Sequence, residues 1–247
     1  MLLSIYISRI QIYQIERGVY MSTVSILGDS ISTYEGYNPD GYEVYYDEFM
    51  QARNRLTDVN VTWWAMTMHH FGWDLCVNNS YSGCKVSGKA FPAASSEARL
   101  LNLKADDSQP DFILIYIGFN DFGYGVEIGK NHLFGTEDTE SFSGAYKQMI
   151  SRIKSLYPTS RVICGTLMRS RIKHNCDWRF PERFAGIPLE EYNHVIRNVC
   201  KKEHIFLADL SAIGQKYETL DGTHPTADGH RVIAEAWIDC IENLQIR

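Results

Sequence analysis

Short apolar runs alternate with segments of helical periodicity from residue 23 onward. The strongest run is Asp111–Gly118 (DFILIYIG), whose continuous apolar character is typical of a strand that is covered on both faces. Four further runs are rich in aliphatic residues: Thr23–Gly28, Asp74–Asn78, Arg161–Leu167 and His204–Leu210. The pattern therefore predicts five β-strands.

Three segments between and after these runs carry apolar residues at helical spacing. They predict helices over 142–156, 189–199 and 233–244, with Pro158 ending the first and Pro188 suited to the first turn of the second. Strands that alternate with helices are the pattern of βαβ units. We therefore expect an α/β fold with a doubly wound parallel sheet. No internal repeat, linker or low-complexity tract interrupts it, which favours a single domain over residues 21–247.

The first twenty residues are predicted to be an N-terminal extension. Charged and amide side chains interrupt their apolar run, and no small-residue cleavage site follows, so they do not resemble a secretory signal. Met21 directly precedes the first predicted strand. Without an export signal, we expect a cytoplasmic protein.

Composition narrows the class of function. The formal net charge of −6 argues against a nucleic-acid-binding protein, because affinity for the phosphate backbone comes from clustered Lys and Arg. No apolar run is long enough to cross a bilayer. The six cysteines form no C-x-x-C pair, and the eight histidines show no metal-site spacing. We expect no cofactor and no metal.

Polar residues gather in the loops that follow the predicted strands. In a doubly wound sheet, such loops surround one crevice at the carboxyl ends of the strands. The four loops in question comprise residues 28–30, 78–83, 118–121 and 221–226.

These loops contain the residue types of acyl transfer. A serine hydroxyl is a weak nucleophile until an imidazole takes its proton, which makes Ser30 the candidate nucleophile and His224 the candidate base. Asp221 can orient that imidazole, as the acid of a catalytic triad does. The candidate donors to an oxyanion are the backbone N–H groups of Ser30 and Gly83 and the side-chain amide of Asn120.

Together the motifs resemble the SGNH (GDSL-type) hydrolase family of serine esterases and lipases. Gly-Asp-Ser follows the first strand, a glycine follows the second, Gly-x-Asn-Asp follows the third, and Asp-x-x-His precedes the last helix. The resemblance extends from about residue 21 to the end of the chain. It implies a three-layer α/β/α, flavodoxin-like fold with a five-stranded parallel sheet. By position, it implies that Ser30, Asp221 and His224 form the triad and that Ser30, Gly83 and Asn120 form the oxyanion hole. Cys84 departs from the family, where many members carry Asp.

The leading hypothesis is a serine esterase that acts through an acyl-enzyme on Ser30. Its substrate would be a small-molecule ester, with a short acyl group such as acetyl on a carbohydrate or small metabolite. Two alternatives remain open: a lysophospholipase or thioesterase of the same family, and a non-catalytic ligand-binding module. The oligomeric state is left open.

Two further segments have more than one interpretation. Five tyrosines over residues 34–46 could stack on a sugar ring, line an acyl pocket or simply pack a long loop. The basic residues of 169–174 are typical of a solvated face, with contact to an anionic substrate group as the alternative.

Overall fold

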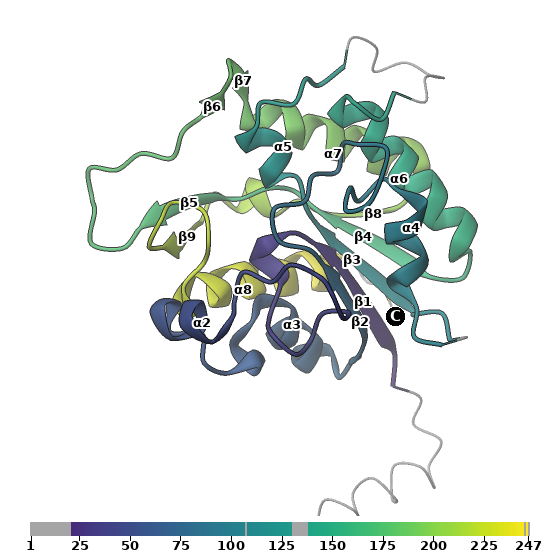
Figure 1. Cartoon of the computed structure of the whole chain (residues 1–247), viewed down its shortest axis with the longest axis horizontal. Coiled ribbons are helices and arrows are strands. Elements are labelled where there is room, and N and C mark those ends of the chain that lie inside the picture. Colours follow the sequence, from purple (N-terminus) through teal and green to yellow (C-terminus); the bar gives the residue numbers. More distant parts are fainter. Residues whose placement is uncertain (1–20, 107, 130–137, 245, 247) are drawn as a thin grey trace, which may run out of the picture.

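The computed structural model describes residues 21–106, 108–129, 138–244 and 246, so the predicted N-terminal extension over residues 1–20 lies outside the described residues. At its centre is a parallel five-stranded sheet in the order β2-β1-β3-β4-β8 (Figure 1). Its strands are β1 (Thr23–Gly28), β2 (Asp74–Ser80), β3 (Phe112–Tyr116), β4 (Arg161–Gly165) and β8 (Phe206–Ala208).

The central strands are apolar because both of their faces are covered. All five residues of β3 are buried, and so are Val24, Ile26 and Leu27 of β1. The strand order reverses at β1, which has β2 on one side and β3 on the other. Gly28 pairs with Ser80 of β2 and with Tyr116 of β3, so these three strands end side by side. Ligands of doubly wound sheets bind at such a switch point.

Helices cover both faces of the sheet and make three α/β/α layers (Figure 1). On one face lie α3 (Trp63–Phe71) and α8 (Ala227–Asn243), where Trp63 stacks on Trp237 with ring centroids 5.2 Å apart. On the other lie α4 (Glu97–Leu100), α6 (Phe142–Leu156) and α7 (Leu189–Glu203). None of the helices in the described residues is long and apolar enough to span a bilayer.

Shorter elements carry the connecting loops. They are α2 (Glu48–Asn54), α5 (Phe119–Gly123), four 3-10 turns, η1 (Ser30–Ser32), η2 (Val59–Val61), η3 (Leu101–Leu103) and η4 (Leu210–Ile213), and two small sheets. One sheet pairs β5 (Arg169–Ile172) in parallel with β9 (Lys216–Thr219), and the other is the antiparallel hairpin of β6 (Arg183–Phe184) and β7 (Ile187–Pro188).

The predicted fold class is confirmed, and its boundaries are refined. The strand predicted over 111–118 stops at Tyr116, because Gly118 adopts φ 135° as the N-cap of α5. The strand predicted over 204–210 is shorter because Leu210 begins a 3-10 turn. Helix α8 begins six residues before the predicted 233, after the Thr226 side chain accepts a hydrogen bond from Gly229 N–H.

Candidate active site

Ser30 lies in the turn that leaves the central strand β1. A Cβ on Gly28 would come within 2.5 Å of Ser32 Oγ, so a larger residue there would displace that side chain. Asp29 Oδ1 accepts a hydrogen bond of 3.1 Å from Ile31 N–H and so caps the 3-10 turn. Ser30 begins this turn and is 5% exposed. Local bonds therefore fix the serine at the carboxyl end of β1.

Side chains from α3 and β2 anchor the same turn. Trp63 Nε1 donates to Ser32 Oγ at 3.1 Å, and Trp64 Nε1 donates to the Ser32 carbonyl at 3.0 Å. Asn78 Nδ2 donates to that carbonyl at 2.8 Å. The turn that holds Ser30 is therefore connected to both α3 and β2.

His224 and Asp221 share one tight loop between β9 and α8. Gly222 takes φ +91°, a conformation that side chains disfavour, and so lets the chain reverse. The N–H groups of Thr223 and His224 both donate to Asp221 Oδ1, at 2.9 and 2.8 Å. This folding of the loop onto its own carboxylate brings the Asp221 and His224 side chains together.

The three predicted triad residues form a continuous hydrogen-bonded chain. Ser30 Oγ lies 3.0 Å from His224 Nε2, and His224 Nδ1 lies 2.8 Å from Asp221 Oδ2. The imidazole side chain is 18% exposed and the carboxylate 36%. Ser30 lies 191 positions before Asp221 and 194 before His224 in the sequence, so the fold brings the serine to the loop of the other two.

The electrostatics favour one protonation pattern. Burial pushes the pKa of Asp221 upward, but the hydrogen bonds and charge of His224 outweigh it and hold that pKa below its ordinary value. Asp221 is therefore ionised and accepts a hydrogen bond from Nδ1–H. The other ring nitrogen, Nε2, is then free to accept the hydroxyl proton of Ser30.

Beside Ser30 lies a second, more deeply buried carboxyl group. Burial raises the pKa of Asp29 to about 7, the N–H of Ile31 opposes this rise, and the neighbouring Asp121 adds to it. The Oδ2 atom of Asp29 is buried and has no hydrogen-bond partner among the described residues. This acid therefore titrates near neutral pH.

The candidate oxyanion donors lie in loops that are bonded to this turn. Gly83 has φ +76°, and a Cβ there would meet no atom within 4 Å, so the backbone at Gly83 is open on that side. Tyr81 N–H donates to the Gly28 carbonyl at 3.2 Å, which ties the loop after β2 to the end of β1. Asn120 lies in α5, directly after β3.

Helix α5 also fixes the loop that carries Gly83. Asn120 Nδ2 donates to the Cys84 carbonyl at 2.9 Å, which leaves its second N–H available. The buried Asp121 carboxylate accepts from Val86 N–H at 2.7 Å and from Ser87 N–H at 3.0 Å. Sequence reasoning did not assign Asp121 this role, because its partners lie 34 and 35 residues away.

The two ambiguous segments now have definite surroundings. Of the tyrosines over residues 34–46, Tyr34 and Tyr46 are buried, and Tyr45 packs against His224. In the basic segment, Arg171 and Lys173 both pair with the nearly buried Glu218, at 3.1 and 2.8 Å. Arg169 pairs with Glu182. These ion pairs disfavour contact between the segment and an anionic substrate group.

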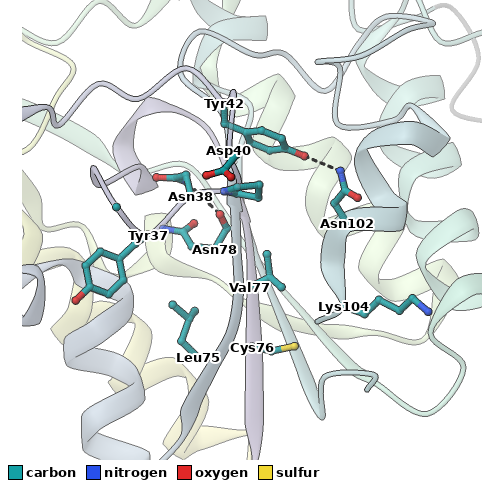
Figure 2. A pocket seen from close by; sticks show the side chains of 12 residues that line it. Tyr37, Asn38, Asp40, Tyr42, Leu75, Cys76, Val77, Asn78, Asn102 and Lys104 are labelled. Atoms are coloured by element: carbon teal, nitrogen blue, oxygen red, sulfur yellow. Dashed lines mark hydrogen bonds between the residues drawn. The ribbon is translucent and has the colours of Figure 1, made fainter. Parts of the chain in front are cut away.

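A separate hollow of about 470 Å³ lies along the outer edge of β2 (Figure 2). The loop after Ser30 forms one wall, with Asn38 donating to the carbonyls of Asn78 and Ser80. Across the mouth, Asn102 Nδ2 donates to Tyr42 Oη at 3.0 Å. No triad residue lines this hollow, so it is distinct from the Ser30–His224 site.

Comparison with known proteins places the chain in a family. The family model of GDSL-like lipase/acylhydrolase matches residues 22–180. That match includes Ser30, Gly83 and Asn120, while Asp221 and His224 follow it in the chain. Among curated protein sequences, none matches the chain significantly.

Solved structures resemble the chain over most of its length. A protein named as a GDSL-like lipase from Bacteroides ovatus is 26% identical, with 91% of this chain and 99% of that one covered and a TM-score of 0.69. Another with the same name, from Bacteroides uniformis, is 27% identical over 92% of this chain and 98% of its own, also with a TM-score of 0.69. A family two carbohydrate esterase from Clostridium thermocellum shares the fold, at 17% identity and a TM-score of 0.52, over 90% of this chain and 63% of its own.

Proposed function

Because the chain belongs to the GDSL-like lipase/acylhydrolase family and is therefore an ester-hydrolysing enzyme, we propose that it hydrolyses short-chain acyl esters through an acyl-enzyme on Ser30. The alcohol part of the substrate is a carbohydrate or another small metabolite. One observation carries the mechanism: Ser30 Oγ, His224 and Asp221 are linked in series by contacts of 3.0 and 2.8 Å.

In the acylation step, His224 Nε2 takes the proton of Ser30 Oγ as that oxygen attacks the ester carbonyl carbon. The carbonyl π bond opens, and the oxygen becomes an anion. Asp221 stabilises the imidazolium that forms. As the tetrahedral intermediate collapses, the bond to the alcohol oxygen breaks and Nε2 returns the proton to that oxygen. The alcohol leaves, and the acyl group stays on Ser30.

In the deacylation step, water replaces the alcohol. His224 Nε2 takes a proton from the water as its oxygen attacks the acyl carbon. Collapse of the second intermediate breaks the bond to Ser30 Oγ, which regains its proton from Nε2. The carboxylic acid is released and the site is restored, without a cofactor.

The oxyanion of both intermediates is stabilised by the N–H groups of Ser30 and Gly83 and by the second amide N–H of Asn120. Donors that are fixed before the reaction stabilise the developing charge without a cost in reorganisation. The contacts of Asn120 with the Cys84 carbonyl, and of Asp121 with the following loop, support such preorganisation.

An exposed aromatic ring near the oxyanion donors supports a carbohydrate or another ring-containing alcohol as the alcohol part of the substrate. Tyr124 lies four residues after Asn120 and is 73% exposed, with Lys85 Nζ 5.9 Å from its ring centroid. Aromatic faces stack on the apolar faces of sugar rings. One structural neighbour is itself a carbohydrate esterase.

The expected cytoplasmic location and the single domain over residues 21–247 stay predictions.

Initial rates on p-nitrophenyl esters from acetate to palmitate, and on acetylated sugars, test this proposal. We expect the highest kcat/KM with acetate or butyrate and none above background in Ser30→Ala. Preference for long chains or for lysophospholipids would replace it with the lysophospholipase alternative, and preference for acyl thioesters with the thioesterase alternative. No turnover of any ester by the folded protein would favour the non-catalytic binding module.

A further inference from the structure

The aromatic ring of Tyr45 lies face to face with the imidazole of His224. The two ring centroids are 3.4 Å apart, and the ring planes differ by 10°. The Tyr45 hydroxyl donates to Asp221 Oδ2 at 3.1 Å. The same oxygen accepts the hydrogen bond from His224 Nδ1–H, at 2.8 Å. One side chain therefore contacts both the base and the acid of the triad.

Hydrogen bonds hold Tyr45 and its neighbour Tyr46 from both sides of the site. Tyr45 N–H donates to Thr33 Oγ1, whose own hydroxyl donates to the Ser30 carbonyl, both at 3.0 Å. The next residue, Tyr46, is fully buried and donates through Oη to the Pro225 carbonyl at 2.7 Å. The Tyr45–Tyr46 pair is thus bonded to the turn of the nucleophile and to the loop of the histidine.

We propose that Tyr45 is a positioning residue of the triad: its ring holds the plane of the His224 imidazole, and its hydroxyl shares Asp221 Oδ2 with Nδ1–H. The inference rests on the proposed function and deepens it. Of the five tyrosines over residues 34–46, Tyr45 then orients the triad rather than lining a sugar or acyl pocket.

The ring and the hydroxyl act on the imidazolium in opposite directions. The face of an aromatic ring attracts a cation, so stacking stabilises the charged imidazole that forms during the reaction. The hydroxyl donates to the carboxylate and disperses its negative charge, which weakens its attraction for the same cation. Burial, followed by the Asp221 charge, raises the pKa of Tyr45, so its hydroxyl stays protonated and acts as a donor.

Other titratable groups near the imidazole behave differently across the assay range. Burial lowers the pKa of His230 to about 3, so this residue stays neutral. The pKa of Asp29 is raised to about 7, which lies within the assay range. Its effect on the pH profile must therefore be separated from that of Tyr45. Among the described residues, Arg53, Tyr46 and Tyr217 also interact with Tyr45, Asp221 or both.

Two substitutions separate the two parts of the side chain. Tyr45→Phe keeps the ring and removes the donor, whereas Tyr45→Leu removes both. Tyr37→Phe is the matched control: it lies in the same loop, is 44% exposed, and its ring contacts Tyr34 and Trp64 rather than the triad. Each substitution is also made in an Asp29→Asn background, so that the titration of Asp29 drops out.

The readouts are kcat and KM per active site, counted with a serine-directed phosphonate, and the pH profile of kcat/KM. We expect Tyr45→Phe to lose about 10-fold in kcat with little change in KM, because Asp221 loses a hydrogen bond that orients its carboxylate toward His224. This loss of orientation outweighs the stronger attraction of the carboxylate for the imidazolium. The midpoint of its acid limb moves to higher pH, because Asp221 regains its full charge. Tyr45→Leu loses more in kcat, and its midpoint lies below that of Tyr45→Phe. Tyr37→Phe matches the unaltered enzyme.

Superimposable pH profiles and equal kcat per active site in all variants would overturn the inference. So would losses that only follow the number of folded active sites, because a purely structural tyrosine would cause those.

An NMR titration of labelled histidines measures the protonation of the His224 imidazole without any substrate. The His224 signal is identified by its absence in His224→Gln. A displaced titration in Tyr45→Phe without ester turnover by the unaltered protein would support the placement and reject the esterase. Turnover with an unchanged titration would do the reverse.

Discussion

Four hydrogen bonds converge on the carboxylate of Asp221. Two backbone N–H groups occupy Oδ1, while Oδ2 receives His224 Nδ1–H and the hydroxyl of Tyr45. In Asp221→Asn, the amide oxygen can still accept from the backbone, but its NH₂ group then faces Nδ1. Nδ1 must become an acceptor, which moves the ring proton to Nε2 and removes the base for Ser30. We therefore expect kcat to fall by up to about 10⁴ with the fold intact.

Steady-state kinetics on p-nitrophenyl acetate, with circular dichroism as the check on folding, measure this effect. If Asp221→Asn kept most of the activity, Ser30 and His224 would operate as a dyad and Asp221 would serve only to shape its loop.

For Asp29 we predict an effect of pH on the stability of the protein rather than on its rate of reaction. Its pKa is raised to about 7 in the folded protein by burial, against an ordinary value of 3.8. The folded state therefore binds this proton more tightly than the unfolded state does. The stabilisation is fully present below pH 3.8 and is lost as the pH rises through 7. Between pH 5 and 8 the loss is about 3 kcal/mol, which Asp29→Asn should not show.

Urea unfolding of both proteins at pH 5, 6, 7 and 8 tests this, because carboxylates that do not interact with Asp29 contribute equally to both proteins and cancel. The free energy of unfolding of the wild-type protein should fall relative to that of Asp29→Asn as the pH rises. Two parallel curves would show that Asp29 has the same proton affinity in both states.

At the scale of elements, α5 couples the third strand to the loop after the second. Asp121, in its first turn, holds that loop through two backbone N–H groups. In Asp121→Asn, one of these N–H groups would face an amide NH₂ and lose its acceptor. We expect a loss of stability of about 1–3 kcal/mol and a lower kcat at nearly constant KM, because Gly83 N–H is no longer held in place.

Thermal unfolding together with kinetics measures both effects of Asp121→Asn. Asp58→Asn is the control, because Asp58 is exposed and caps a 3-10 turn outside the site. An Asp121→Asn protein with unchanged Tm and kcat would show that the loop is held by other contacts.

Elements with a continuous apolar pattern could be predicted from the sequence, and elements held by polar contacts could not. The bounds predicted for β1 match the structure, because its buried residues are contiguous. Strands β5 (RSRI) and β9 (KYET) carry alternating charges and no apolar run. They pair partly through the contact of Glu218 with Arg171 and Lys173, which lie more than 40 residues away. No local signal predicts such a pair.

The same distinction applies to the site. Candidate triad and oxyanion positions could be named from the sequence because each follows a predicted strand or precedes the last helix, where a doubly wound sheet gathers its loops. Tyr45 follows no strand, and it meets Asp221 across 176 residues only because its loop crosses between two others. A run of tyrosines was visible there, but its partner was not.

At the scale of the whole molecule, the alignment of strand ends determines where the chemistry can occur. Gly28, Ser80 and Tyr116 are paired across β2, β1 and β3, so the loops after them open at one edge of the sheet (Figure 1). The loop that carries His224 reaches this edge from the start of α8, which packs against α3 on one face of the sheet. The core thus supports the site from below, while the reacting atoms lie in loops.

The central claim is that Ser30 is the nucleophile, and covalent labelling tests it most directly. A p-nitrophenyl phosphonate ester should react once per chain, with the Ser30 Oγ–phosphorus bond replacing the bond to p-nitrophenolate. Mass spectrometry of the digested protein should place the adduct on Ser30, with none in Ser30→Ala and slow labelling in His224→Ala. An adduct on another residue, or a folded protein that stays unlabelled, would contradict the account.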